Sequence, residues 1–94
     1  MSFVPHQERH QLHGVTVVLE TTGQATYVGR LDTADDRGVV LKDVGIHDPA
    51  ATELPKAEYL QRALKFGIRK DRDAVLVENE RVATIIPLGK FTTA

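Results

Sequence analysis

Two turns between predicted strands carry polar side chains that could contact a nucleic acid. Arg37 lies in the turn Asp35-Asp36-Arg37-Gly38, and its planar guanidinium suits both stacking on a base and contact with a phosphate. Asn79 lies in a second turn, where its side-chain amide could bind a base edge. Structural roles are open to both residues as well. Arg37 could pair with a neighbouring carboxylate, and asparagine tolerates the positive φ of a tight turn.

Residues 65–72 form the most basic stretch of the chain. Its four cations could contact phosphates, with an affinity that falls as salt is added; they are Lys65, Arg69, Lys70 and Arg72. A solvated helix end is the alternative, because positive charge is favourable near a helix C-terminus.

Three histidines near the N-terminus could share one face of a helix. His6, His10 and His13 follow a spacing of four and then three residues. A metal site needs a fourth group and a fixed second shell of partners, and no such partner is identifiable. We therefore expect a solvated or interface face, with no metal and no cofactor.

The composition argues against an enzyme and against a strongly basic nucleic-acid binder. The 94 residues include no cysteine, which excludes a thiol nucleophile, and the only serine is Ser2 near the N-terminus, where we do not expect a catalytic nucleophile. Twelve Lys and Arg against thirteen Asp and Glu leave a net charge of −1. This length predicts one domain over residues 1–94. No apolar stretch is long enough for a signal or membrane segment. We expect a non-catalytic cytoplasmic protein.

Strand and helix signals alternate along the chain in an order typical of a small β-rich domain. Gly29 within the second strand indicates a bulge or sharp bend. Apolar residues 57, 60 and 64 predict an amphipathic helix that could cover the sheet. We predict a helix over 5–13, three strands within 14–44, an insert over 45–73 with a helix at 55–66, and two strands within 74–89 that form a tight terminal hairpin about residues 79–80.

This pattern resembles the Sm-like (LSm) domain family over roughly residues 5–44 and 74–89. The first family motif has a strand, a Gly turn, a second strand with an internal Gly and the loop Asp-x-x-Met-Asn. Here 15–19, Gly23, 27–31 and 35–39 take those places. The second motif has a strand, Arg-Gly and a last strand, matched by 75–79 and 81–88. The resemblance implies a strongly bent five-stranded antiparallel barrel, and the helical insert is a departure from the family.

The resemblance also implies a ring-shaped homo-oligomer, a hexamer or heptamer, in which the fourth strand of one subunit pairs with the fifth of the next. The interface residues would be Val75, Leu76, Val77, Val82, Thr84 and Ile86. It further implies that single-stranded RNA binds at the two loops, through Asp35, Arg37 and Asn79.

Three residues depart from the family's RNA pocket. Val39 replaces its asparagine, Glu78 replaces its arginine, and Asn79 replaces the following glycine. An adaptor oligomer that has lost base-specific RNA binding, and that holds a protein partner with the insert helix, is therefore the alternative function.

Overall fold

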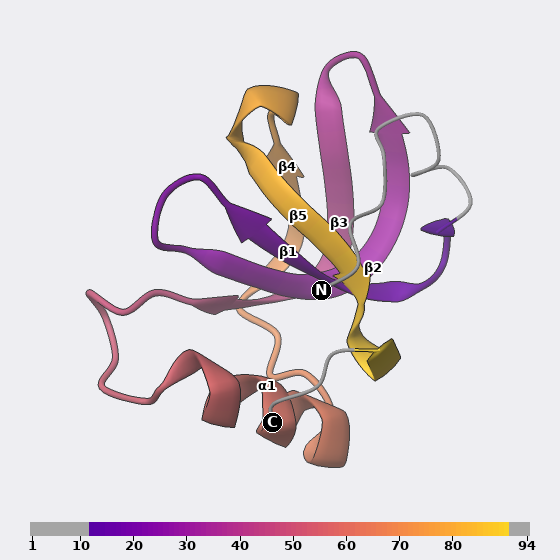
Figure 1. The fold of residues 1–94 in the computed structure, drawn as a ribbon. Helices are drawn as coiled ribbons and strands as arrows, with labels where there is room; N and C mark the ends of the chain where they lie inside the picture. Colours follow the sequence, from indigo (N-terminus) through magenta and orange to yellow (C-terminus); the bar gives the residue numbers. More distant parts are fainter. Residues whose placement is uncertain (1–11, 91–94) are drawn as a thin grey trace.

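The computed structural model describes residues 12–90, and it is mainly β (Figure 1). Five antiparallel strands form one sheet in the order β4-β3-β2-β1-β5. The elements are β1 (Thr16–Thr21), β2 (Thr26–Asp35), β3 (Gly38–His47), α1 (Lys56–Phe66), β4 (Arg72–Val77), the 3-10 turn η2 (Asn79–Arg81), β5 (Val82–Pro87) and the 3-10 turn η3 (Leu88–Lys90). Five strands and an insert helix are as predicted. The predicted helix over 5–13 falls mostly outside the described residues.

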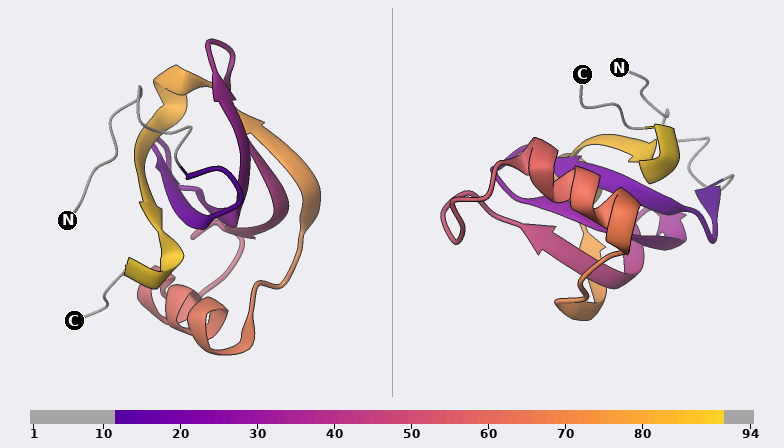
Figure 2. Two further views of the ribbon diagram at one scale, coloured as in Figure 1. Left: turned by 90° about the vertical axis from the view of Figure 1, so that its right-hand side faces the viewer. Right: turned by 90° about the horizontal axis from the view of Figure 1, so that it is seen from below.

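The sheet is strongly curled, because a short connection joins the two strands at its opposite edges. β4 and β5 lie at opposite edges of the sheet, yet only residues 78–81 separate them in the chain. Because consecutive Cα atoms are about 3.8 Å apart, these ends of the two edge strands must lie close together. Figure 2 shows the strands wrapping around a common interior. The sheet is not closed, because the ladders of the described residues do not join β4 to β5.

The predicted terminal hairpin is therefore wrong. β4 pairs with β3, and β5 pairs with β1. Residues 79–81 make a 3-10 turn that passes from one edge of the sheet to the other. A tight turn between two strands does not by itself require that they pair, and here each strand pairs with a different strand of the sheet.

Two register shifts bend the long hairpin of β2 and β3. The first lies at Gly29, opposite Asp43, which has a φ of 52°. The second lies between Leu31 and Thr33. Such irregularities place an extra residue in one strand and increase the local twist. A side chain at Gly29 would come within 3.0 Å of the Lys42 carbonyl oxygen. The bend predicted from Gly29 is confirmed.

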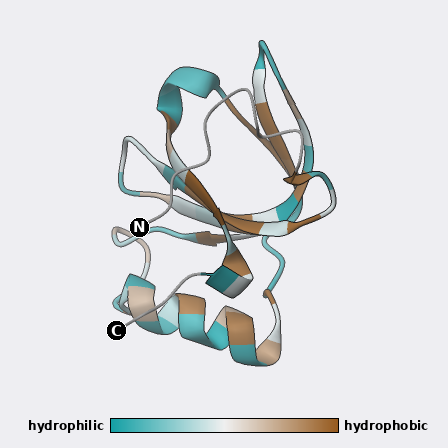
Figure 3. Ribbon diagram, turned by 45° about the vertical axis from the view of Figure 1, so that its right-hand side comes forward, coloured by the Kyte–Doolittle hydropathy of each residue, from teal (hydrophilic) through white to brown (hydrophobic). Residues whose placement is uncertain are grey.

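β1 is buried on both faces because the sheet interior lies on one side and α1 on the other. Val17 and Leu19 pack into the interior cluster with Leu41 and Ile85. Val18 belongs to a second cluster with Val28, Leu60, Ala63, Ile86 and Leu88. A continuous apolar run is what a strand covered on both faces requires. Figure 3 shows such apolar stretches along the strands and alternating bands on α1.

The insert helix begins after Pro55 and ends at Gly67, as predicted. Pro55 precedes the first turn, and Gly67 has a φ of 90° and donates its backbone N–H to the Ala63 carbonyl. The buried side chains of the helix are Leu60 and Ala63, whereas Leu64 is exposed. The buried stripe is therefore rotated from the predicted one, because the helix packs by the edge that faces β1 and β5.

Candidate nucleic-acid interface

The fold brings together the two turns that the sequence indicated. The Asn79 side-chain nitrogen Nδ2 donates hydrogen bonds to the carbonyls of Asp35, at 2.9 Å, and Asp36, at 3.3 Å. Gly38 is buried against the Val77 carbonyl at the same place. Figures 1 and 2 show both turns at the end of the sheet away from α1. Asp35, Arg37 and Asn79 thus form one loop cluster from residues 44 positions apart.

Asp35 holds the turn in shape. Its carboxylate accepts a hydrogen bond from the Arg37 backbone N–H at 2.9 Å and one from the Arg37 guanidinium at 3.3 Å. The backbone bond first, and the guanidinium second, hold the pKa of the Asp35 carboxyl below its ordinary value. The pairing of Arg37 with a neighbouring carboxylate, which the sequence suggested, is therefore present.

The Arg37 side chain is 85% exposed, so its ion pair with Asp35 leaves much of the guanidinium accessible. Exposed pairs of this kind contribute little to stability and are easily exchanged for another partner. The Arg37 side chain can therefore stack on a base or contact a phosphate at small cost.

Val39 and Glu78, two of the positions at which the sequence differs from the Sm-like motifs that it resembles, lie in different surroundings. Val39 is fully buried and belongs to the interior cluster, so its side chain cannot meet a ligand at the surface. Glu78 is exposed beside the loop cluster and brings negative charge there. The loop cluster therefore lacks the hydrogen-bonding side chain and the cation that the family places at these two positions.

The basic stretch lies apart from the loop cluster, beyond the far end of β3. The Asp71 backbone N–H donates to the Val44 carbonyl, and the Asp71 carboxylate accepts from the Ile46 N–H. Lys70 forms ion pairs with Asp73 at 2.9 Å and Asp43 at 3.9 Å. The Asp73 carboxylate raises the pKa of Lys70, and Lys70 in turn lowers the pKa of Asp73.

The other three residues predicted to contact phosphates lie in different surroundings. The Lys65 ammonium lies 5.7 Å from the centre of the Phe66 ring, and Arg72 begins β4. Arg69 lines a pocket described below. The four predicted cations are thus spread from the last turn of α1 to the first residue of β4.

Both strands of the predicted subunit interface lie at sheet edges. Each of β4 and β5 has a ladder partner on one side in the described chain. Val77 and Ile86 are buried in the core, so these two residues could pair only through their backbone. Leu76 is 54% exposed. The remaining interface residues, Val75, Val82 and Thr84, are half-buried.

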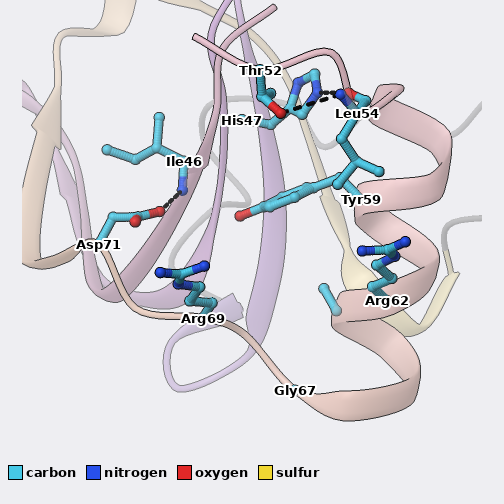
Figure 4. Close-up of a pocket in the computed structure, with 10 residues that line it drawn as sticks. Ile46, His47, Thr52, Leu54, Tyr59, Arg62, Gly67, Arg69 and Asp71 are labelled. Atoms are coloured by element: carbon cyan, nitrogen blue, oxygen red, sulfur yellow. Dashed lines mark hydrogen bonds between the residues drawn. The ribbon is translucent and has the colours of Figure 1, made fainter.

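A pocket that the sequence did not indicate lies between the end of β3, α1 and the α1–β4 connection (Figure 4). Its volume is about 300 Å³, and its lining includes His47, Tyr59, Arg62 and Arg69. His47 falls in the predicted insert before its helix, and Tyr59 falls within the predicted helix over 55–66. No local pattern could show that the two rings meet at a centroid distance of 5.3 Å.

The described residues add three further findings. A ring nitrogen of His13 contacts the Asp32 carbonyl oxygen, and residues 12–90 contain no group of three or more His, Cys, Asp and Glu side chains arranged to hold a metal. His6 and His10 lie outside this range. None of the helices in residues 12–90 has the length and apolar character needed to cross a membrane.

Comparison with known proteins does not assign the chain to a family. No protein-family model matches it, and a search of curated proteins finds no match.

Proposed function

We propose that this protein is a non-catalytic, ring-forming Sm-like protein that binds single-stranded RNA at the loop cluster of Asp35, Arg37 and Asn79. The observation that carries the proposal is the sheet order β4-β3-β2-β1-β5. A ring built by pairing the fourth strand of one subunit with the fifth of the next requires both strands to be sheet edges. A barrel of this kind completes its hydrogen bonding through its neighbours.

The edge strands themselves support this assembly. β4 and β5 contain six residues each, so their lengths match for antiparallel pairing. Leu76 gives β4 an exposed apolar side chain, and unpaired edges with apolar side chains favour pairing with another chain. Head-to-tail contacts of this type form a ring when the rotation between neighbouring subunits closes.

The RNA part of the proposal depends on Arg37. Stacking of a base on a side-chain plane is worth about 1–3 kcal/mol, so one such contact per subunit is weak. A ring repeats the contact around its axis and binds one strand several times over. The whole ring can then bind RNA with useful affinity, although each chain has a net charge of −1.

Native mass spectrometry across protein concentrations tests the ring. We expect a closed multiple of 10.4 kDa, six or seven subunits, that persists on dilution. A monomer at all concentrations would refute the ring and remove the avidity on which RNA binding depends.

Fluorescence anisotropy with a labelled single-stranded oligouridylate tests RNA binding. Arg37→Ala should weaken binding roughly tenfold, and added salt should weaken binding by the unchanged protein. Arg30→Ala is the matched control, because it removes the same charge from the middle of β2, where Arg30 pairs with Asp43. Absence of binding at low salt would refute this function.

An adaptor oligomer without base-specific RNA binding is the second candidate. Buried Val39 and exposed Glu78 favour it over the first. Leu64, 46% exposed, and Phe66, 77% exposed, give α1 an apolar surface for a protein partner. A ring that fails to bind the oligouridylate would support this candidate.

A further inference from the structure

The pocket beside α1 lies at the opposite end of β3 from the loop cluster. β3 runs from Gly38, at the loop cluster, to His47, in the pocket wall. At about 300 Å³ the pocket is at the lower end of the range of small-molecule sites, about 300–1,000 Å³. Leu54, Ala63 and the Tyr59 ring give it an apolar side. The pocket is therefore of a size and composition that suit a small organic molecule.

Two buried polar atoms in the pocket wall have no hydrogen-bond partner. His47 is 3% exposed, and its Nε2 contacts the Leu54 carbonyl oxygen at 2.6 Å. Because a carbonyl only accepts, Nε2 carries a proton, and Nδ1 is left without a hydrogen-bond partner. The Tyr59 hydroxyl is likewise shielded and unpaired. Unpaired buried groups carry a free-energy cost that a bound partner would remove.

The Tyr59 hydroxyl points from α1 across the pocket, toward β3 and the α1–β4 connection (Figure 4). Burial, and then the negative charge of Asp71, raise the pKa of the Tyr59 hydroxyl, so it keeps its proton at neutral pH. A protonated hydroxyl can donate a hydrogen bond to an oxyanion.

Two arginines supply positive charge from opposite walls. Arg62 extends from α1 and Arg69 from the α1–β4 connection (Figure 4). Arg62 has a 3.6 Å ion pair with Glu58, in which both side chains are largely exposed. No ion pair joins Arg69 to another described side chain. The Asp71 carboxylate in the lining already accepts the Ile46 N–H. Planar guanidinium groups suit the oxygens of a phosphate.

We propose that this pocket binds the phosphate group of a small phosphorylated molecule. Arg62 and Arg69 bind the phosphate oxygens, the Tyr59 hydroxyl donates to the ligand, and the apolar side contacts the ligand's body. The proposal is independent of RNA binding at the loop cluster, since the two sites share no residue. The phosphate could belong to a free nucleotide or to an RNA strand, and the experiment separates these sources.

The test is a titration of the full chain followed by the backbone amide signals in a ¹H–¹⁵N NMR spectrum, with uridine 5′-monophosphate, uridine and inorganic phosphate as probes. We expect the monophosphate to shift the amides of 45–47, 59–63 and 67–71, and uridine to leave them in place. Arg69→Gln should weaken binding of the monophosphate about tenfold. The control Arg81→Gln removes the same charge from the exposed turn η2 and should change nothing at the pocket.

Tyr59→Phe separates a ligand contact from a packing role. Removing an unpaired buried hydroxyl should raise the midpoint of thermal unfolding of the free protein. The same change should weaken binding of the monophosphate severalfold. Packing alone would give the first effect without the second. A titration with the oligouridylate identifies the source of the phosphate. If it shifts the amide signals of the pocket at the same phosphate concentration as the monophosphate, the site is assigned to RNA.

Two results would overturn the proposal. One is a monophosphate that leaves the pocket amides unshifted in the well-folded protein. The other is unchanged affinity in both Arg69→Gln and Tyr59→Phe. Either result could occur with normal RNA binding at the loop cluster, so failure of this site is distinguishable from failure of the proposed function.

Discussion

Gly38 is the residue on which the loop cluster depends most directly. Its φ is 146°, and a side chain there would lie 2.3 Å from the Val77 carbonyl oxygen and 3.0 Å from the Glu78 Cα. Both obstacles are backbone atoms, which a side-chain rotation cannot remove. The close approach of the two turns therefore requires glycine at this position.

Replacing Gly38 should separate the two turns and destabilise the fold. Gly38→Ala combines an unfavourable φ with a steric clash, so we expect a loss of about 2 kcal/mol in the free energy of unfolding. Chemical denaturation measures this loss. Gly89→Ala is the control, because nothing lies within 4 Å of a side chain at that position. Equal stability of the two variants would contradict the role assigned to Gly38.

The Asp35 titration tests the two bonds that shape the turn. Because the Arg37 backbone N–H lowers the Asp35 pKa most and the guanidinium less, Arg37→Ala should raise that pKa only part of the way to its ordinary value. Carbon-13 NMR of the Asp35 carboxyl measures both values. An unchanged pKa in Arg37→Ala would contradict the observed side-chain bond.

The sign of the associated stability follows from the direction of the shift. A carboxyl whose pKa is lower in the folded state stabilises that state above its unfolded pKa. For Asp35, this contribution is lost as pH falls through the folded pKa. Acidification should therefore loosen the turn.

At the scale of elements, α1 is fixed to the sheet through a close approach at Gly45. A side chain there would lie 2.5 Å from the Tyr59 hydroxyl oxygen, 2.8 Å from Ile68 Cγ2 and 3.0 Å from the Arg69 carbonyl oxygen. Gly45 lies near the end of β3, and these three groups come from α1 and the α1–β4 connection. The strand, the helix and the connection therefore pack together at this point.

Gly45→Ala should displace α1 and cost about 1–3 kcal/mol in the free energy of unfolding. The double variant Gly45→Ala with Tyr59→Phe should recover part of that loss, because it removes the nearest of the three obstacles. Denaturation of the two single variants and the double variant measures the coupling. Strictly additive losses would contradict the contact between Gly45 and Tyr59.

At the scale of the whole molecule, the two edges of the sheet are the surfaces through which we propose that copies pair. Leu76→Lys places a charge on the exposed side of β4, a substitution of the kind that prevents edge pairing. We expect this variant to be a folded monomer by native mass spectrometry. Phe66→Lys is the control, since it places the same charge on an exposed apolar residue of α1. A Leu76→Lys ring as stable as the unchanged one would contradict pairing through β4.

Local signals predicted most elements of this fold because local chemistry determines them. Pro55 and Gly67 delimit the insert helix through their fixed or positive φ, and Gly29 marks a bulge. Strand lengths were less predictable. β3 extends to His47 and β4 begins at Arg72, both inside the predicted insert over 45–73, because pairing across the sheet overrides local preference.

The sequence by itself determined the order of strands and helix and the polar residues of the two turns, since these depend on neighbours within a few positions. Only the tertiary structure decided that β4 and β5 lie at opposite edges of the sheet. It also decided that Asn79 donates to the carbonyls of Asp35 and Asp36, and that the Tyr59 ring contacts the His47 ring beside two arginines. These contacts join residues far apart in the chain. They arise from burying β1 on both faces of one curled sheet, which no local pattern contains.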